Sequence, residues 1–231
     1  MLSQTDGLTQ KEVVKAVLEG LHQGLSTCKT LKSNIILCAM NHRNPNENHD
    51  ENIETIHLAK EYLNQGVCAI DLAGYEENMS DYQDLFDLAH QLGIPTTTHS
   101  EFTVKDALKY GTTRIGHGYQ AAQIEELTQA VIDKNITLEM CPDSSLSYEY
   151  HLTGDYNHPL AVLYRKGAKV TVNTDNLTVL DTSLEFEYEL VRKMGLTDDD
   201  IVIMNNYAIE ACFADQKIKE ELLRIQPTPV H

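Results

Sequence analysis

The feature that most constrains the fold is a repeated pattern in which a short strand-like run ends in polar residues and a helical segment follows it. Residues 169–176 (KVTVNTDN) show the pattern most clearly, because three strand-forming residues lead directly toward Asp175. The same pattern recurs at residues 95–101 (PTTTHSE), 113–119 (TRIGHGY) and 136–142 (ITLEMCP). Buried barrel strands look like this when their carboxyl ends open into an active site. The sequence therefore predicts that the ends of several strands gather functional side chains.

Counting such runs gives six parallel strands, which are expected at residues 34–40, 66–73, 95–100, 113–118, 136–141 and 169–175. Segments with helical periodicity separate the strands, except that a longer connection is expected at residues 143–157. Further helices are expected after the last strand. This alternation predicts a parallel sheet whose right-handed crossovers coil it toward a barrel. A complete (β/α)8 barrel has eight strands and about 250 residues. We therefore expect an incomplete α/β fold of the TIM-barrel type, with residues 1–225 as one domain and a flexible tail at 226–231.

Composition excludes several classes of partner. The formal charge of −17 argues against nucleic acid and against anionic membrane surfaces, because both attract clustered lysine and arginine. The five cysteines form no CxxC pair and lie mostly in apolar runs, which is typical of reduced cysteines in the cytoplasm. No run reaches the roughly 18 apolar residues of a membrane span, and the first residues do not resemble a signal peptide. We therefore expect a soluble cytoplasmic protein.

Four strand-end residues carry the predicted chemistry: His99, Glu101, His117 and Asp175. Imidazole and carboxylate groups at the ends of different strands suit a divalent metal such as Zn²⁺, which activates water. Glu101 would then protonate a substrate, and His117 would orient or deprotonate the water. Taken singly, a strand-end histidine is often only hydrogen-bonded, and Asp175 could cap the following helix. Their joint position at successive strand ends, which share one face of a barrel, favours a functional role.

Over nearly its whole length the sequence resembles the metal-dependent adenosine deaminases. The segments that carry the resemblance are CAIDLAGYE, TTTHSE, RIGHGY, EMCPDSSL and TVNTDN, in the order of that family's fourth to eighth barrel strands. The resemblance implies a zinc cofactor, a purine nucleoside as substrate, and hydrolytic removal of the 6-amino group of adenosine to give inosine and ammonia. It also implies roles for single residues. His99 and Asp175 match zinc ligands. His117 matches the histidine that acts on the metal-bound water, and Gly74 matches the glycine whose backbone amide faces the purine.

The sequence departs from that family at three places. Where the family has His-Ala-Gly-Glu, residues 99–102 read HSEF, so Glu101 matches the catalytic acid only across a deletion, and Phe102 takes that place otherwise. Asn176 stands where the family usually has an aspartate that holds the purine N7, and its amide can donate a hydrogen bond there. The family's His-x-His zinc pair occurs nowhere in the 231 residues, and the chain begins at what resembles the helix before the third strand.

These departures lead to expectations for the chain by itself. With His99 and Asp175 as the only recognised ligands, we expect zinc to bind weakly and deaminase activity to be near background. Without a first and a second strand, the outer edges of residues 33–40 and 169–175 would expose unpaired backbone groups. We therefore expect either marginal stability or completion of the barrel by another chain or by a second copy in a homo-oligomer.

Two other interpretations stay open. A catalytically dead relative would keep purine affinity or act as a scaffold, which the missing zinc pair favours. An amidohydrolase-type deaminase would act on another purine, and the asparagine at position 176 leaves that open. Metal content separates the first alternative from an active enzyme, and a panel of purines separates the second.

Overall fold

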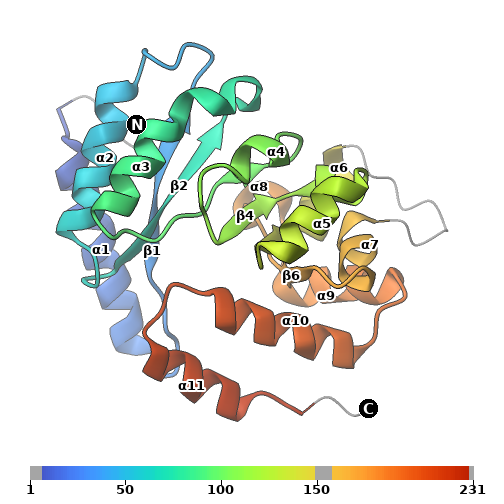
Figure 1. The fold of residues 1–231 in the computed structure, drawn as a ribbon. Coiled ribbons are helices and arrows are strands. Elements are labelled where there is room, and N and C mark those ends of the chain that lie inside the picture. The colour runs from blue at the N-terminus through green and yellow to red at the C-terminus, as the bar shows by residue number, and fades with distance from the viewer. Residues whose placement is uncertain (1–6, 149–157, 229–231) are drawn as a thin grey trace. The chain divides into compact units, whose positions relative to one another are not determined.

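The computed structural model describes residues 7–148 and 158–228 of the chain, whose helices and strands are shown in Figure 1. The chain divides into two compact units. Unit 1 consists of Met1–His99 and Lys109–Gly111, and unit 2 consists of Ser100–Leu108 and Thr112–His231. Each unit has its own cluster of buried apolar side chains, so each has its own hydrophobic core.

Unit 1 is built on two parallel strands. β1 (Ile35–Asn41) pairs with β2 (Val67–Gly74), and the pairing reaches the carboxyl ends, where Asn41 lies opposite Gly74. The other elements are α1 (Gln10–Thr27), α2 (His49–Glu61), the 3-10 helix η1 (Glu76–Tyr82) and α3 (Gln83–Gln91). Ile56 of α2, Ile70 of β2 and Phe86 of α3 are buried together in the core. This apolar contact fixes the ends of β1 and β2 relative to their helices.

Unit 2 contains most of a four-stranded sheet with the strand order β3-β4-β5-β6. These strands are β3 (His99–Ser100), which spans the boundary between the units, β4 (Arg114–His117), β5 (Thr137–Met140) and β6 (Lys169–Val172). β4 and β5 are parallel, as are β5 and β6, with Gly116 opposite Glu139 and Met140 opposite Val172. The carboxyl ends of β4, β5 and β6 therefore lie at one edge of the sheet.

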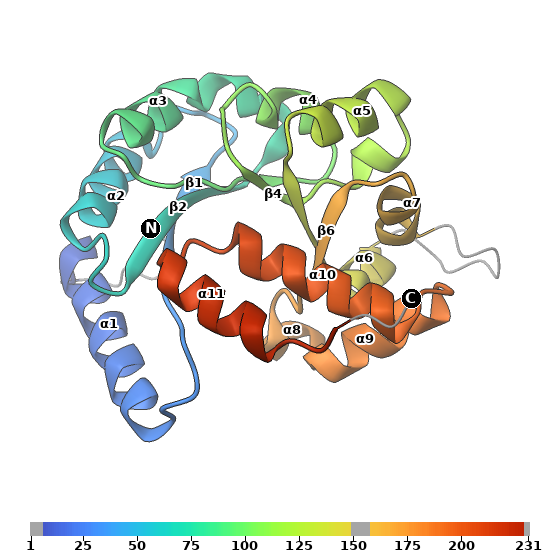
Figure 2. The same ribbon diagram turned by 60° about the horizontal axis from the view of Figure 1, so that its bottom comes forward.

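Helices cover the strands of unit 2, and α10 packs against β6 (Figure 2). Leu138 and Val170 from the strands share a core with Val191 of α9 and Met204 of α10. None of the helices in the described part of the chain is long and apolar enough to cross a membrane. The helices of the unit are α4 (Val104–Ala107), η2 (Tyr119–Ala122), α5 (Glu125–Asp133), α6 (Pro142–Tyr148), α7 (Pro159–Arg165), α8 (Leu177–Leu180), α9 (Leu184–Lys193), α10 (Asp198–Ala211) and α11 (Gln216–Ile225).

The structure confirms the α/β fold with parallel strands, and the six strands found among the described residues lie at the six predicted places. The strand expected at 95–100 is shorter, because before His99 the chain forms only an isolated parallel bridge between Ile70 and Thr96. The longer connection expected at 143–157 begins with a helix that the sequence analysis did not predict, Pro142–Tyr148, which starts with proline, a residue suited to a first helical turn. Residues 149–157 of that connection, and 229–231 of the predicted tail, lie outside the described residues.

Candidate active site

The carboxyl end of β4 holds His117 in an unusual backbone conformation. His117 has φ 64° and Gly118 has φ 71°, so the chain turns through two successive left-handed residues. That conformation is unfavourable for a residue other than glycine and is often found at functional sites. A side chain at position 118 would collide with Leu138, which explains the glycine there. Gly118 N donates a hydrogen bond of 2.9 Å to Ser100 O and holds the turn. His117 is therefore fixed, and it is only 6% exposed.

A chain of hydrogen bonds places the proton of His117. The Tyr119 hydroxyl donates to Cys141 O over 3.1 Å, and His117 Nδ1 lies 3.2 Å from the same hydroxyl. Because that hydroxyl has one hydrogen and gives it to the carbonyl, Nδ1–H is the donor in the second bond and Nε2 keeps its lone pair. Burial raises the pKa of Tyr119, so the phenol stays protonated at neutral pH. His117 therefore offers Nε2 as a base or as a metal ligand.

The end of β6 positions Asp175 in a similar way. Asn173 N donates to Met140 O over 2.9 Å and extends the strand pairing by one residue. Asp175 then adopts a left-handed conformation with φ 55°. Ser144 Oγ donates to Asp175 Oδ2 over 2.7 Å, which holds one of the two carboxylate oxygens. The carboxylate is thereby oriented while the residue as a whole remains exposed.

Asn176, and not Asp175, caps the helix that follows β6. The Asn176 side-chain oxygen accepts a hydrogen bond of 3.0 Å from Val179 N, at the start of α8. The alternative in which Asp175 merely caps this helix is therefore wrong. Because the cap uses the carbonyl oxygen of Asn176, its amide N–H₂ is the group that can donate to a ligand.

Cys141, just past the end of β5, lies between these two strand ends. His117, Cys141 and Asp175 each offer one ligand atom, and the three atoms lie within 4.8 Å of one another. Burial raises the pKa of the Cys141 thiol well above its usual value, and the nearby charge of Asp175 adds to the rise. The register of the sheet produces this arrangement, because His117 ends β4 and Cys141 directly follows the neighbouring parallel strand β5.

Glu101 lies just past β3 and is half-buried, whereas Phe102 is 47% exposed. Glu101 O accepts a hydrogen bond of 2.9 Å from Gln120 N, which ties this segment to the turn after β4. Burial is the main cause of the raised pKa of Tyr119, and the negative charge of Glu101 adds to the rise. Of the two candidates for the place of the catalytic acid, Glu101 is therefore the one whose charge acts on the group that orients His117.

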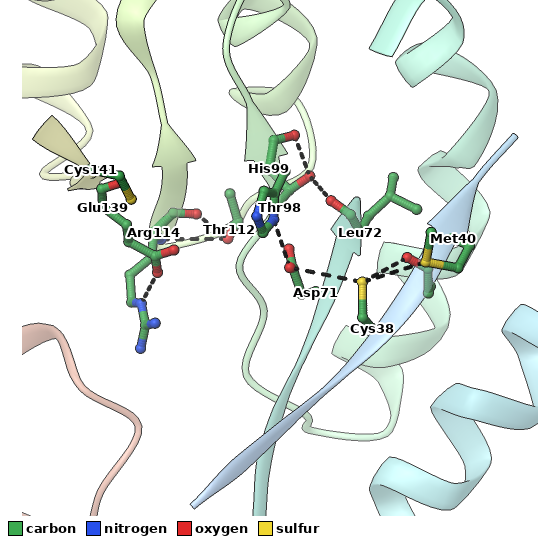
Figure 3. A network of polar contacts seen from close by, with 11 residues as sticks. Cys38, Met40, Asp71, Leu72, Thr98, His99, Thr112, Arg114, Glu139 and Cys141 are labelled. Carbon is green, nitrogen blue, oxygen red and sulfur yellow. Dashed lines mark hydrogen bonds and ion pairs between the residues drawn. The ribbon is translucent and has the colours of Figure 1, made fainter. Parts of the chain in front are cut away.

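In unit 1, β2 ends at Gly74 and carries Asp71 within the strand, where Asp71 pairs with His99. Gly74 has φ 129°, and a side chain there would collide with the backbone of Asn41. Figure 3 shows His99 and Asp71 in contact, and His99 Nδ1 lies 2.7 Å from Asp71 Oδ2. Because Nδ1 faces that carboxylate, Nε2 is the nitrogen suited to a metal. The Asp71 side chain is 11% exposed and that of His99 is 40% exposed, so a buried carboxylate supports a more exposed imidazole.

Two concave regions contain none of the predicted site residues. A cavity of about 230 Å³ in unit 2 is lined by Arg114 and Glu139, which form an ion pair visible in Figure 3. The Arg114 guanidinium carbon also lies 4.2 Å from the centroid of the Phe213 ring, so this arginine is held from two sides. A groove of about 830 Å³ in unit 1 runs along α1 to Gly66, at the amino end of β2 and thus at the opposite end from Gly74.

The structure brings His117 and Asp175 together in unit 2, with the charge of Glu101 acting nearby. Gly74 and His99 belong to unit 1, so their convergence with the residues of unit 2 stays a prediction. Sequence reasoning missed several residues of the site, although each lies within or next to a motif that it had singled out. These residues are Asp71, Tyr119, Cys141 and Ser144.

The matches to known proteins agree with this geometry. The family model for adenosine deaminase covers residues 1–225 of the chain. The chain belongs to the adenosine deaminase family. Adenosine deaminase of Haemophilus ducreyi is 38% identical over 230 residues, covering 94% of this chain and 65% of the relative. That of Clostridium acetobutylicum is 38% identical over 228 residues, covering 94% and 66%. An adenine deaminase of Rhizobium meliloti is 31% identical over 236 residues, covering 96% and 71%.

The chain thus spans about 65% of the length of the first of these adenosine deaminases. Solved structures share its fold. An amidohydrolase from Burkholderia ambifaria with bound Zn has a TM-score of 0.83 at 19% identity, covering 95% of this chain and 62% of the other. An Arabidopsis N6-mAMP deaminase has a TM-score of 0.80 at 24% identity, covering 96% and 69%. These likenesses establish the TIM-barrel type of the fold.

Proposed function

We propose that this protein is a zinc-dependent adenosine deaminase, which converts adenosine and water to inosine and ammonia. The observation that carries the proposal is the pair of strained strand ends in unit 2, where His117 and Asp175 are both held in left-handed conformations with ligand atoms close together. Strain of this kind persists where the surrounding structure enforces it, and it is concentrated at functional sites. Membership of the adenosine deaminase family supports the reaction.

His99 and Asp175 are the residues that would hold the metal. The chemistry of both fits zinc, because each side chain has one polar atom occupied by a supporting neighbour, Asp71 or Ser144, and another atom that can serve as a ligand. When bound, zinc supplies a Lewis acid that lowers the pKa of a coordinated water. The relative from Burkholderia ambifaria contains Zn.

The other residues would bind the substrate and move protons. We assign to His117 Nε2 the proton taken from the attacking water, and to Glu101 the proton given to the purine ring. A bond forms between the water oxygen and C6, and the proton taken up by His117 passes to the amino nitrogen, which leaves as ammonia when its bond to C6 breaks. The remaining hydroxyl proton returns to Glu101, so that inosine has a C6 carbonyl and keeps the proton on its ring. The Gly74 backbone amide and the Asn176 side-chain amide would donate hydrogen bonds to the purine.

Three further features of the protein belong to this proposal. We infer that residues 1–225 act as one catalytic domain, because the family model covers that range. The five cysteines are free thiols, which supports a cytoplasmic location. Among the described strands, β1 and β6 each stand at the end of a strand order, so another chain or a second copy would find backbone groups to pair with there.

The test is product formation by concentrated protein in long incubations with added zinc, followed by mass spectrometry. His99 and Asp175 are the only zinc ligands recognised in the sequence, so we expect slow turnover. Inosine and ammonia should form in equal amounts. Formation should rise with zinc and vanish in Asp175→Asn. His57→Gln, at an exposed position in α2, is the matched control and should be unaffected. If no purine in a panel is deaminated, the proposed reaction is wrong.

A second candidate keeps the chemistry and changes the substrate. The adenine deaminase of Rhizobium meliloti is 31% identical to this chain, and position 176 has asparagine where aspartate is usual in the family resemblance. The panel above should therefore contain adenine beside adenosine. A third outcome, in which purines bind and none reacts, would identify a catalytically dead purine-binding relative.

A further inference from the structure

We propose that His117, Cys141 and Asp175 form a binding site for a thiophilic divalent cation of the cadmium class, and that its occupancy inhibits the enzyme. One ligand atom from each residue lies within 4.8 Å of the other two. The ligand set differs from the His99–Asp175 pair assigned above, because it includes a thiol and needs no residue of unit 1.

The donor set and its size fit such a cation. Thiolate, imidazole and carboxylate are the three side-chain ligands that zinc uses in proteins, and the thiol favours soft cations over Mg²⁺ or Ca²⁺. Zinc–ligand bonds of about 2.0–2.3 Å at tetrahedral angles place neighbouring ligand atoms about 3.5 Å apart. The three atoms thus need to approach by about 1 Å, which small side-chain rotations supply.

Two of the three ligands are already oriented. Tyr119 contacts His117 Nδ1, which leaves the Nε2 lone pair as the group that can bind a cation. Ser144 Oγ holds Asp175 Oδ2, which fixes the plane of that carboxylate. A cation therefore meets ligands that lose little conformational freedom on binding, and this strengthens binding.

Burial defines how a cation enters. His117 is 6% exposed and Cys141 is 5% exposed, whereas Asp175 is exposed. A cation would reach the cluster past the carboxylate of Asp175 and then be shielded from solvent by the other two residues. Since the cation would occupy the His117 Nε2 and the Asp175 carboxylate, neither group would remain for the roles proposed in deamination. Binding itself does not depend on those roles being correct.

Cadmium binding to the intact chain tests the site without any activity measurement, because a cadmium–thiolate bond has an ultraviolet charge-transfer band. The titration uses a Cys28→Ser background, which removes an exposed thiol. We expect the band to saturate at one cadmium per chain and to vanish in Cys141→Ser. Cys212→Ser removes a half-buried thiol of the same unit and should leave the band intact. In His117→Gln and in Asp175→Asn the affinity should fall about 10-fold or more, as it does when a metal site loses one ligand or its support.

Two results would overturn the site. A band that persists in Cys141→Ser would place the cadmium on another cysteine. A band whose affinity is unchanged in both His117→Gln and Asp175→Asn would show that Cys141 binds as a single thiol. Asp175 is exposed, so Asp175→Asn is expected to fold. If Cys141→Ser does not fold, the cadmium affinity of Asp175→Asn still tests the site. A protein that binds cadmium in this way and deaminates no purine would support the site and refute only the proposed function.

Discussion

The strand ends of the two units hold their polar groups by different means. In unit 1, β1 and β2 keep their register to the last residue, and His99 rests on the buried carboxylate of Asp71. In unit 2, the chain leaves β4 and β6 through left-handed residues, His117 and Asp175, whose ligand atoms lie close to a buried thiol. The difference teaches that unit 1 places a buried carboxylate behind its proposed metal ligand, whereas unit 2 places its proposed reactive groups on strained backbone.

The largest expected effect is the loss of the proposed base in unit 2. His117→Gln keeps the approximate size of the side chain and removes the titrating nitrogen. Deaminated product should fall by about 10²–10⁴-fold, the usual contribution of a general acid or base. The thermal midpoint should change little, because the Tyr119–Cys141 hydrogen bond remains. Product formation at the parental rate would show that His117, at the end of β4, is not the base, and the proposed contrast between the two units would be wrong.

The supporting role in unit 1 is tested at Asp71. Asp71→Asn removes the charge behind His99, and zinc affinity should fall about 10–100-fold, as is typical when the partner of a metal-binding histidine is lost. Asp84→Asn is the matched control, because Asp84 forms a 2.7 Å pair with the exposed His49 in the same unit. The measurement is a zinc titration against a chromophoric chelator. Equal losses in both variants would mean that Asp71 acts only through overall charge.

His158 of unit 2 is a useful contrast to His117, because neighbouring groups contact both of its ring nitrogens. His158 Nδ1 accepts from Leu160 N over 3.1 Å, and Nε2 lies 2.5 Å from Ser145 Oγ. Burial lowers the pKa of His158 from 6.5 to about 4. The neutral form is thus favoured in the folded state, so its stabilisation is complete above pH 6.5 and is lost as pH falls through about 4. The loss should approach about 3 kcal/mol.

Urea unfolding of the parent and of His158→Gln over that pH range measures this effect. Glutamine does not titrate, so the free energy of unfolding of the variant should depend less on pH, and the gap between the two proteins should narrow toward pH 4. A gap that stays constant across the range would show that His158 does not change its protonation on unfolding.

The smallest expected effect concerns the cap after β6. Asn176→Ala removes the acceptor for Val179 N and should lower the free energy of unfolding by about 1 kcal/mol, whereas Asn176→Asp keeps a capping oxygen and should not. Thermal melts of the two variants measure the difference. An alanine variant as stable as the parent would show that this cap contributes nothing and that Asn176 is held for another reason.

The sequence predicts the positions of the strands well because each is a short strand-like run between helical segments. It also places Glu101, His117 and Asp175 at strand ends, which the structure confirms. It does not predict the left-handed conformations of His117 and Asp175, since these depend on contacts with distant residues such as Ser144. The sequence places Cys141 only among the reduced cysteines, and the strand register is what shows that it reaches the other two.

The most direct test of the account asks whether His99 of unit 1 and Asp175 of unit 2 hold the same ion. Zinc affinity is measured for His99→Ala, Asp175→Ala and the double variant, all in a Cys141→Ser background that removes the thiol of the other site. Ligands of one ion are energetically coupled, so we expect the double variant to bind zinc no more weakly than the weaker single variant. Losses that add in free energy would show that the two residues act at separate sites, and would contradict the account.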